Sequence, residues 1–491
     1  MVDRHEKGIS DPHISKSIVA NSLVWKILER LFSQGGNLII QIILARLLLP
    51  SDFGSLAIIM AIINYLSIFV QSGLSAALIQ KKNLREVDVS TMLAISMVIS
   101  TVLYIGVYLS APLISNYYGD PLLLKPIRVT GLVLFLYALN SIQVGLLSRN
   151  MDFKVIFIRS IIAVPFAGCV AIIMAYKGLG IWALIANLLI NIALSTAIMM
   201  IGSKVRLRLR FSYKSAKALY SFSIKIMGAN IISGFCDLLR TTMIGKRYSV
   251  SELAFYDKAT TYSSLITQIV GNSIQSVLLP VFSRQQESLE NLKNTVRRSI
   301  GMSMFGLTPI LLGLFVIAKP FVVVLLTEKW LPCVPYLMLF CLFRYSGSIV
   351  GIDKQALLAI NKGSILFYYE FLLLIANVTM LFITIPISVM AIAIGAIIVE
   401  YSANFVLIII SRRVYGYTLT ERFVDLLKPL LSSIGMMVGM YAITYATNDY
   451  VTQLVVQIIV GLIIYFVMSK ILNDNNLKYI FEVINNKFYK N

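Results

Sequence analysis

The chain has 491 residues, of which 58% are hydrophobic and only 13% are charged. Soluble domains usually carry about 25% charged residues, so this composition excludes a string of water-soluble domains and indicates an integral membrane protein. Lys and Arg outnumber Asp and Glu by 43 to 23, which gives a formal net charge of +20. A membrane span needs roughly 20 apolar residues, so fourteen spans would use most of the chain and exclude a sizeable soluble enzyme domain.

Apolar windows separated by charged residues or by Pro and Gly predict fourteen membrane-spanning helices. They cover about 17–49, 53–80, 88–115, 122–149, 154–176, 179–202, 213–246, 251–282, 292–326, 332–360, 364–385, 388–411, 423–447 and 450–471. The 292–326 segment is also long enough for a surface helix followed by a span. The expected fold is therefore an all-α polytopic membrane protein.

The N-terminal tail and the cysteines add little chemistry. The first 16 residues are polar and show no cleavage site, so the first span is expected to be retained as a signal-anchor. The four cysteines, which form no CxxC pair, are interpreted as small hydrophobic residues. His5 and His13 lie in the tail, far from any ligand cluster. No metal site and no cofactor is expected.

Basic residues are distributed unevenly between alternate connections. The set of connections that contains both termini holds 28 Lys and Arg residues, and the opposite set holds at most seven. Because cytoplasmic loops collect Lys and Arg, both termini are expected in the cytoplasm. The basic run from Lys204 to Lys217 is then a cytoplasmic connection against anionic lipid, and no nucleic-acid partner is expected.

Eight further cations fall inside the predicted spans, where a charge at a helix centre costs roughly 2.5–3.5 kcal/mol. They are Lys26, Arg30, Lys125, Arg128, Lys225, Arg240, Arg344 and Lys354. The acids inside the spans are Glu29, Asp237, Asp353, Glu370 and Glu400. Internal pairing cannot neutralise all the bases, although Lys125 and Lys354 lie near helix ends and can snorkel instead.

Polar residues at steps of three and four form a stripe on the first span that includes Lys26 and Arg30, with Glu29 at its edge. The seventh span has a similar stripe with Asp237 and Arg240, which can pair with each other. Ser and Asn stripes can simply join helices by hydrogen bonds. Unpaired Lys and Arg favour a hydrated cationic cavity, which would select an anionic substrate such as a phosphate or pyrophosphate.

No GxxxxGK[ST] motif is present, so energy is expected from an ion gradient, the substrate gradient or the membrane potential. A weak repeat at an offset of 200 residues relates residues 45–54 to 245–254 and residues 75–80 to 275–280. It predicts a parallel duplication with the site between two lobes. The expected divisions are a tail at 1–16, six-helix lobes at 17–211 and 212–411, and two additional helices with a cytoplasmic tail at 412–491.

Four motifs in order resemble those of the Wzx-type polysaccharide flippases of the multidrug/oligosaccharidyl-lipid/polysaccharide (MOP) superfamily, most closely the colanic-acid exporter branch. They are Gln41–Gly54, Ser72–Lys81, Ser276–Arg284 and Leu326–Trp330. The resemblance covers about residues 17–415. Thr327 and Leu49 depart from the family pattern at turn positions, which leaves the shape of those loops open.

This resemblance implies that the chain moves an undecaprenyl-pyrophosphate-linked oligosaccharide from the inner to the outer leaflet of a bacterial cytoplasmic membrane. It also raises polysaccharide polymerase and chain-length regulator proteins as partners, and H⁺ or Na⁺ as a counter-ion. The substrate-binding candidates are the eight intramembrane cations given above. Glu29, Asp237 and Glu400 are the coupling candidates. For Glu400, in the middle of the twelfth span, a static pair with a base such as Arg344 or Lys354 is the alternative role.

Two other functions stay open at this point. A drug or cation antiporter of the same superfamily would favour an acidic cavity, which the excess of intramembrane bases opposes. A membrane-embedded glycosyltransferase or polymerase would normally carry clustered acids or His on an ordered extramembrane loop. None of the predicted periplasmic connections is long enough for such a loop, so a non-enzymatic transporter is the preferred interpretation.

Overall fold

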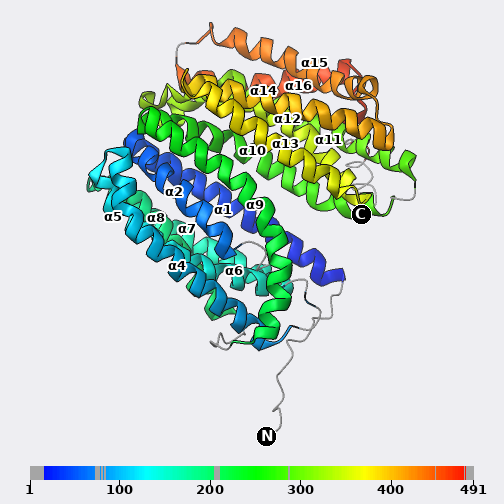
Figure 1. Cartoon of the computed structure of the whole chain (residues 1–491). Coiled ribbons are helices and arrows are strands. Elements are labelled where there is room, and N and C mark those ends of the chain that lie inside the picture. The colour runs from blue at the N-terminus through cyan, green and yellow to red at the C-terminus, as the bar shows by residue number, and fades with distance from the viewer. Residues whose placement is uncertain are drawn as a thin grey trace. The chain divides into compact units, whose positions relative to one another are not determined.

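The structure is a computed structural model that describes residues 16–71, 78, 81, 84–203, 211–285, 288–447, 449–479 and 482. Long helices dominate these ranges (Figure 1). Their contacts group the chain into two compact units, Met1–Ala254 (unit 1) and Phe255–Asn491 (unit 2).

Unit 1 is built from long helices with one short break after α4. Its elements are α1 (Lys16–Leu47), α2 (Pro50–Gln71), α4 (Glu86–Tyr118), the 3₁₀ helix η1 (Pro121–Leu123), α5 (Leu124–Gly131), α6 (Val133–Arg149), α7 (Phe153–Tyr176), α8 (Ile181–Gly202) and α9 (Tyr213–Arg247). The next helix, α10 (Val250–Ser283), begins in unit 1 and continues into unit 2.

Unit 2 contains the rest of α10 and the helices that follow it. They are α11 (Leu289–Leu326), the 3₁₀ helix η2 (Glu328–Trp330), α12 (Cys333–Ala359), α13 (Gly363–Thr384), α14 (Val389–Tyr415), α15 (Leu419–Ile443) and α16 (Tyr450–Ile471).

The predicted spans correspond to these helices, except that most of residues 72–80 of the second predicted span lie outside the described residues. The chain is a polytopic helical membrane protein. Within the described residues, eleven helical segments are long and apolar enough to cross a membrane, with Pro121–Arg149 taken as one segment. One detail differs from the predicted layout: the fourth span is divided into η1, α5 and α6. The ninth predicted span corresponds to one continuous helix, α11, which contains Pro309 and Pro320.

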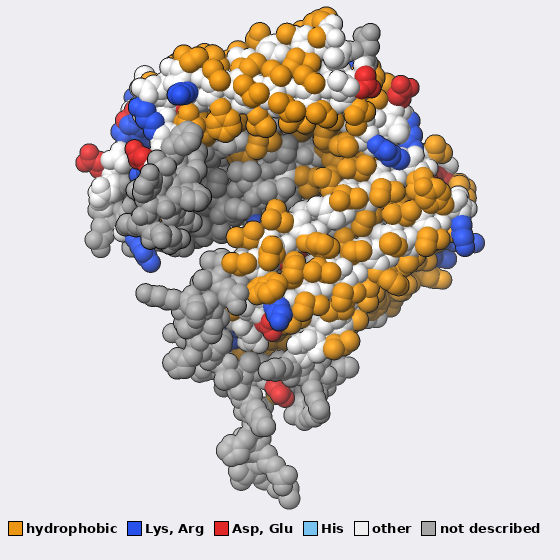
Figure 2. All heavy atoms as spheres, turned by 180° about the vertical axis from the view of Figure 1, so that it is seen from behind, with side chains coloured by type: hydrophobic (Ala, Val, Ile, Leu, Met, Phe, Trp, Pro, Cys, Tyr) orange, Lys and Arg blue, Asp and Glu red, His pale blue; other side chains and the backbone are white. Residues whose placement is uncertain are grey.

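Hydrophobic side chains cover much of the outward helix faces, with few charges among them (Figure 2). On α4, for example, Val102, Leu109 and Leu113 are 63%, 68% and 72% exposed. Such exposure would be unfavourable in water, but it matches helix faces that contact lipid.

The core of unit 1 lies where α2, α4, α5 and α6 meet, and it includes the buried side chains Ile63, Val107, Ile127 and Leu134. Separately, α1 packs along α7, and α9 packs on α2 and α4. Because α9 makes these contacts, the compact units divide at Ala254, later in the chain than the boundary expected at residue 211. The assignment of α9 to a second six-helix lobe stays a prediction.

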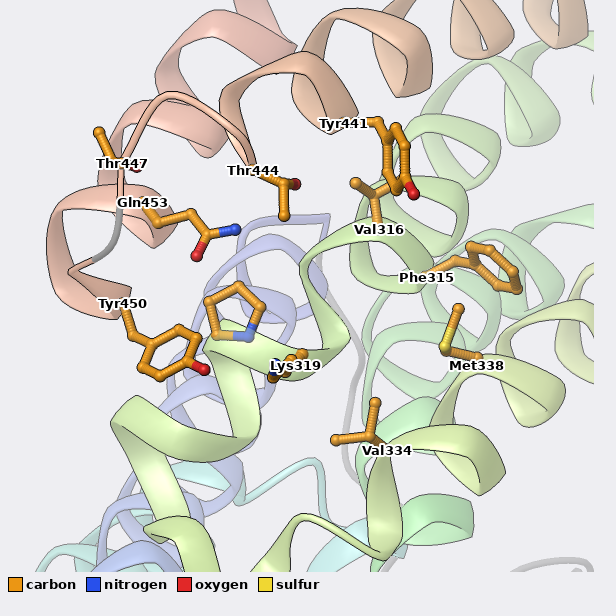
Figure 3. Close-up of a pocket in the computed structure, with 11 residues that line it drawn as sticks. Phe315, Val316, Lys319, Val334, Met338, Tyr441, Thr444, Thr447, Tyr450 and Gln453 are labelled. Carbon is orange, nitrogen blue, oxygen red and sulfur yellow. The ribbon is translucent and has the colours of Figure 1, made fainter.

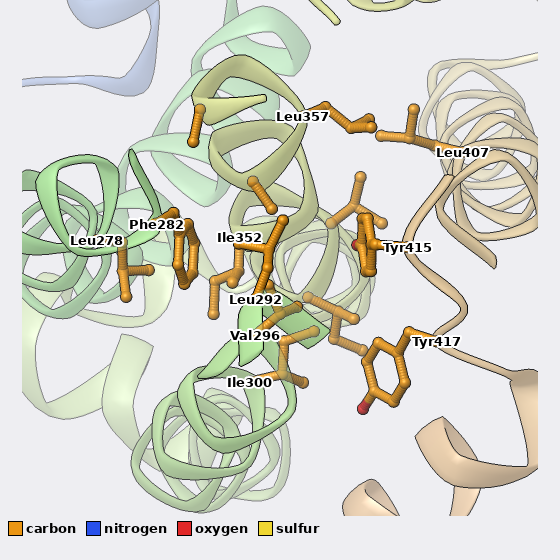
Figure 4. Packing of buried hydrophobic residues seen from close by; sticks show 14 of the residues in the cluster. Leu278, Phe282, Leu292, Val296, Ile300, Ile352, Leu357, Leu407, Tyr415 and Tyr417 are labelled. Carbon is orange, nitrogen blue, oxygen red and sulfur yellow. The ribbon is translucent and has the colours of Figure 1, made fainter. Parts of the chain in front are cut away.

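The core of unit 2 joins α10, α11, α12 and α14 through large apolar side chains such as Phe282, Ile300, Ile352 and Leu407 (Figure 4). Tyr417, in the turn between α14 and α15, is fully buried in the same cluster. The core therefore extends to the beginning of the last helix pair.

The last two helices pack closely on each other, and α15 also packs on α11. The glycines at their contact permit this approach: a Cβ at Gly461 would lie 2.7 Å from the Met440 sulfur. From α16, the Tyr465 hydroxyl donates to the carbonyl of Phe305 on α11 at 2.7 Å. The pair is thus bonded directly to the body of unit 2.

Candidate substrate-binding and coupling residues

The polar stripe of α1 keeps its two bases apart from its acid. Ser160 on α7 donates to a carboxylate oxygen of Glu29 at 3.1 Å, and the guanidinium of Arg159 lies 3.9 Å from the same oxygen. Lys26 is exposed, with its ammonium 5.4 Å from the centre of the Phe153 ring. Arg30 is half-buried. Among the side chains that the structure describes, neither base forms an ion pair.

On α9, Asp237 and Arg240 form the i,i+3 pair that their spacing predicts. The Nη1 atom of Arg240 lies 3.1 Å from Oδ1 of Asp237. The Asp237 side chain is 74% exposed, whereas that of Arg240 is 25% exposed. The bases of α1 and α9 come from two packing neighbourhoods of unit 1, because α1 lies along α7 and α9 lies on α2 and α4.

Lys125 and Arg128 lie on the short helix α5, at the end of a span and not at its centre. The segment begins with the 3₁₀ turn η1 at Pro121, directly before α5. The Arg128 guanidinium stacks 4.0 Å from the centre of the Tyr108 ring, and its Nε donates to the Tyr108 carbonyl at 3.3 Å. These contacts favour a role in attaching α5 to α4.

Lys354, on α12, is paired within unit 2. Its ammonium lies 2.7 Å from a carboxylate oxygen of Glu370 on α13, and 4.8 Å from the centre of the Tyr369 ring. Arg344 is half-buried on the same helix. The side chain of Lys225, also predicted to bind substrate, is outside the residues whose side chains the structure describes.

Glu400 belongs to a polar cluster between α12, α13 and α14. Asn404 donates to Glu400 at 3.1 Å and to the Ser346 hydroxyl at 2.8 Å, and it accepts from the Tyr369 hydroxyl at 2.7 Å. Asn404 is 2% exposed, so its amide is held by three neighbours in the interior. Glu400 thus accepts a hydrogen bond from Asn404, whereas Lys354 pairs with Glu370.

A second charged cluster, which contains none of the predicted binding or coupling residues, connects α11, α12 and α15. Arg422 makes two parallel hydrogen bonds to Asp353, and the Tyr415 hydroxyl also donates to Asp353. Gly416 caps the C-terminal end of α14 in the left-handed conformation, with a φ of 75°. The chain turns at this residue, between Tyr415 and Tyr417. We call this set, with the residues described next, the α15 anchor.

The outer part of the α15 anchor surrounds Arg297 of α11. Its guanidinium donates to both oxygens of Asp425 at 2.8 and 2.9 Å and to Glu421 at 3.0 Å. Lys293 adds a 2.7 Å ion pair to Glu421. Burial raises the pKa of the Tyr417 phenol, which stays protonated and donates to Asp425 at 2.9 Å. One feature of the sequence could have predicted this cluster: Asp353 is an acid inside a predicted span, and such an acid usually pairs with a base.

Within the described ranges, no three His, Cys, Asp or Glu side chains cluster closely enough to hold a metal ion. The four cysteines are free, and Cys333 and Cys341 are buried. The polar groups that these helices present are therefore basic side chains, carboxyl groups and amides.

Sequence comparison supports a transport role. A family model described as "Polysaccharide biosynthesis protein" matches residues 43–335. The succinoglycan biosynthesis transport protein ExoT of Rhizobium meliloti is 24% identical over 366 residues, which are 74% of each chain. The lipopolysaccharide biosynthesis protein WzxC of Escherichia coli is 24% identical over 419 residues, covering 83% of this chain and 81% of WzxC.

Solved structures show the same fold. The lipid II flippase MurJ, in an inward closed conformation, matches with a TM-score of 0.76 at 17% identity, over 92% of this chain and 98% of MurJ. An inward-facing multidrug resistance transporter of the MATE family, within the MOP superfamily, matches with a TM-score of 0.59 at 14% identity over 80% and 97% of the two chains. At these identities the likeness establishes the fold alone.

Proposed function

Because this chain belongs to the polysaccharide biosynthesis protein family, we propose that it is a flippase for a lipid-linked oligosaccharide. The substrate is an undecaprenyl-pyrophosphate-linked repeat unit of an O-antigen, capsule or exopolysaccharide. It moves from the cytoplasmic to the periplasmic leaflet of a bacterial inner membrane, with both termini of the protein in the cytoplasm. The names of ExoT and WzxC support a polysaccharide pathway, and the fold of MurJ supports lipid transport.

One observation supports the anionic substrate most directly: the acid on the α1 stripe is engaged elsewhere. Glu29 accepts a hydrogen bond from Ser160 of α7 and lies close to the Arg159 guanidinium. Among the described side chains, Lys26 and Arg30 therefore form no ion pair with a carboxylate. Two bases one helical turn apart, exposed or half-buried, can hold a pyrophosphate. Lys offers a mobile point charge, and Arg offers a planar fork of donors.

Arg240 is the third base of the proposed clamp. Its bond to Asp237 is on the helix surface, and Asp237 is largely exposed, so a more highly charged pyrophosphate can compete for the guanidinium. Binding by several partly hydrated cations allows release as well as capture. The sugars then travel in water while the isoprenoid chain stays in lipid, and the lobes rock to open the site to each side in turn.

Coupling to a cation gradient is assigned to Glu400. Its carboxyl is half-buried and shares Asn404 with Ser346 and Tyr369, so a change in its charge can alter hydrogen bonds on α12, α13 and α14 together. H⁺ and Na⁺ are both compatible with this oxygen-rich cluster. Polysaccharide polymerase and chain-length regulator proteins are the expected downstream partners.

The proposal is tested by reconstitution. Purified protein in liposomes should move a fluorescently labelled undecaprenyl-pyrophosphate oligosaccharide between leaflets, measured as the fraction accessible to an added glycosidase. Protein-free liposomes and the same lipid without pyrophosphate are the controls. Transport of a cationic dye without movement of the oligosaccharide would support the antiporter alternative, and elongation of the oligosaccharide would indicate a polymerase. Either result would overturn the proposal.

A further inference from the structure

Unit 2 contains a cavity of about 400 Å³ between α11, α12, α15 and α16 (Figure 3). It lies near the C-terminal ends of α11 and α15 and the N-terminal ends of α12 and α16. The distribution of basic residues assigns this end of the helices to the periplasmic side. The volume falls within the range of about 300–1,000 Å³ that is usual for sites that bind small molecules.

The cavity is confined to one end of the contact between α15 and α11. At the opposite end, the α15 anchor closes the contact through Arg297, Glu421 and Asp425. At an intermediate level, a Cβ on Gly313 of α11 would lie 3.6 Å from the Met436 side chain of α15, an ordinary packing distance. Protein groups therefore join α15 to α11 at one end, whereas the cavity lies between α15, α16, α11 and α12 at the other end.

The lining combines two chemistries. Figure 3 shows Tyr450 and Gln453 on one side of the cavity and Phe315 and Met338 on the other. Lys319, on α11, contributes the cation, and its ammonium lies 5.5 Å from the centre of the Tyr450 ring. No carboxylate within the described parts of the chain pairs with this ammonium. The cavity thus offers a positive charge and polar groups beside an apolar wall.

Tyrosines at the same level indicate where the cavity lies in the membrane. Tyr441 lines it and is 56% exposed. Its hydroxyl accepts a hydrogen bond from the hydroxyl of Tyr445, which is 76% exposed. Exposed tyrosines at the ends of spanning helices are typical of the membrane–water interface. A Lys at this depth can extend its ammonium to the level of lipid phosphates.

We propose that this cavity binds one anionic glycerophospholipid, with its phosphate at Lys319 and the upper part of an acyl chain against Phe315 and Met338. Both parts of the lining then have a partner: the ammonium faces a phosphate, and the apolar wall faces hydrocarbon. The bound lipid joins the periplasmic ends of α15 and α16 to α11 and α12. This site shares no residue with the proposed pyrophosphate clamp, so it is independent of the proposed function.

Native mass spectrometry of the full-length protein in detergent, titrated with phosphatidylglycerol or phosphatidylcholine, tests the site. Wild-type protein should retain one phosphatidylglycerol in preference to phosphatidylcholine. Lys319→Gln should weaken that binding by about fivefold, the effect of one basic residue at an anionic membrane surface. Lys177→Gln is the matched control, because Lys177 is exposed in the connection between α7 and α8 on the same predicted side. This control should bind as the wild type does.

A second variant tests the apolar wall without touching the charge. Met338→Trp fills the cavity and should reduce retention of phosphatidylglycerol, as measured against the same control. Unchanged binding in both Lys319→Gln and Met338→Trp would overturn the site. Equal binding of phosphatidylcholine would overturn the role of the anionic lipid. Displacement of the lipid by inorganic phosphate alone, or a strong preference for undecaprenyl phosphate, would assign the cavity to a free anion or to the transported lipid and overturn the proposal.

Discussion

Arg422 and Asp353 lie 69 residues apart in the chain and face each other in the interior of unit 2 through two parallel hydrogen bonds. Nη1 donates to Oδ2 at 2.8 Å, and Nη2 donates to Oδ1 at 2.7 Å. Their side chains are only 4% and 0% exposed. The Arg422 guanidinium also stacks 4.1 Å from the centre of the Tyr417 ring. A planar pair of this kind connects the first turn of α15 to the C-terminal part of α12.

Removing one partner of this pair should destabilise the protein strongly. Arg422→Ala leaves the Asp353 carboxylate buried without its base, a change that costs about 3–5 kcal/mol for buried ion pairs. We expect a lower apparent Tm and lower abundance in the membrane. Arg413→Ala is the control, because Arg413 is exposed near the same end of α14.

The double variant Asp353→Leu, Arg422→Met separates charge from packing. Since it leaves no unpaired charge, it should recover much of the stability lost in Arg422→Ala. The losses of stability in Asp353→Leu and Arg422→Met are measured separately. If the loss in the double variant equals their sum, the ion pair is not the source of the stability lost in Arg422→Ala.

Arg30→Ala tests the proposed clamp. Loss of a charge-assisted bond to the pyrophosphate should lower the initial flipping rate in liposomes by about tenfold or more. Arg30→Lys should retain part of the activity, because the charge remains and only the planar fork is lost. Lys177→Ala, on an exposed connection, serves as the control for expression and reconstitution. A wild-type rate for Arg30→Ala at normal abundance would end the clamp hypothesis.

Arg240 can be tested through its own partner. Arg240→Ala should abolish flipping while leaving abundance nearly unchanged, because its pair with Asp237 is on a surface and contributes little to stability. If the pair were purely structural, the double variant Asp237→Ala, Arg240→Ala would regain the activity that the single variant lost. We expect the double variant to stay inactive in the same liposome assay.

Glu400→Gln tests coupling. The groups near its carboxyl are Asn404 and Tyr369 of the polar cluster and the charged Arg344, Lys354 and Glu370. An amide cannot bind and release a proton, so transport by this variant should lose its dependence on pH or on Na⁺. The experiment measures the initial rate across a pH series at fixed Na⁺ and across a Na⁺ series at fixed pH.

Glu290→Gln is the control for coupling, because Glu290 is an exposed acid in the first turn of α11, outside this cluster. It should keep the cation dependence of the wild type. Normal transport by Glu400→Gln with its pH and Na⁺ dependence intact would show that the Glu400 carboxyl has no coupling role.

Much of the helical layout could be predicted from local patterns. The span expected at 364–385 corresponds to α13, Gly363–Thr384, and that at 450–471 corresponds to α16, Tyr450–Ile471. The hydropathy of a span is a sum over neighbouring residues, so a window of about 20 residues is enough to locate the span. The i,i+3 pair of Asp237 and Arg240 was predictable for the same reason, because the geometry of one helix determines it.

The tertiary structure decided which charges meet. Arg422 counts in the sequence as one of many cytoplasmic bases, yet the packing of α15 buries it against Asp353. Lys354 finds Glu370 only because α12 and α13 lie side by side, and Glu29 is turned to Arg159 because α1 packs along α7. A charge–charge contact depends on distances of a few ångströms between segments far apart in the chain. Composition and period leave those distances open, and only the packing of the helices determines them.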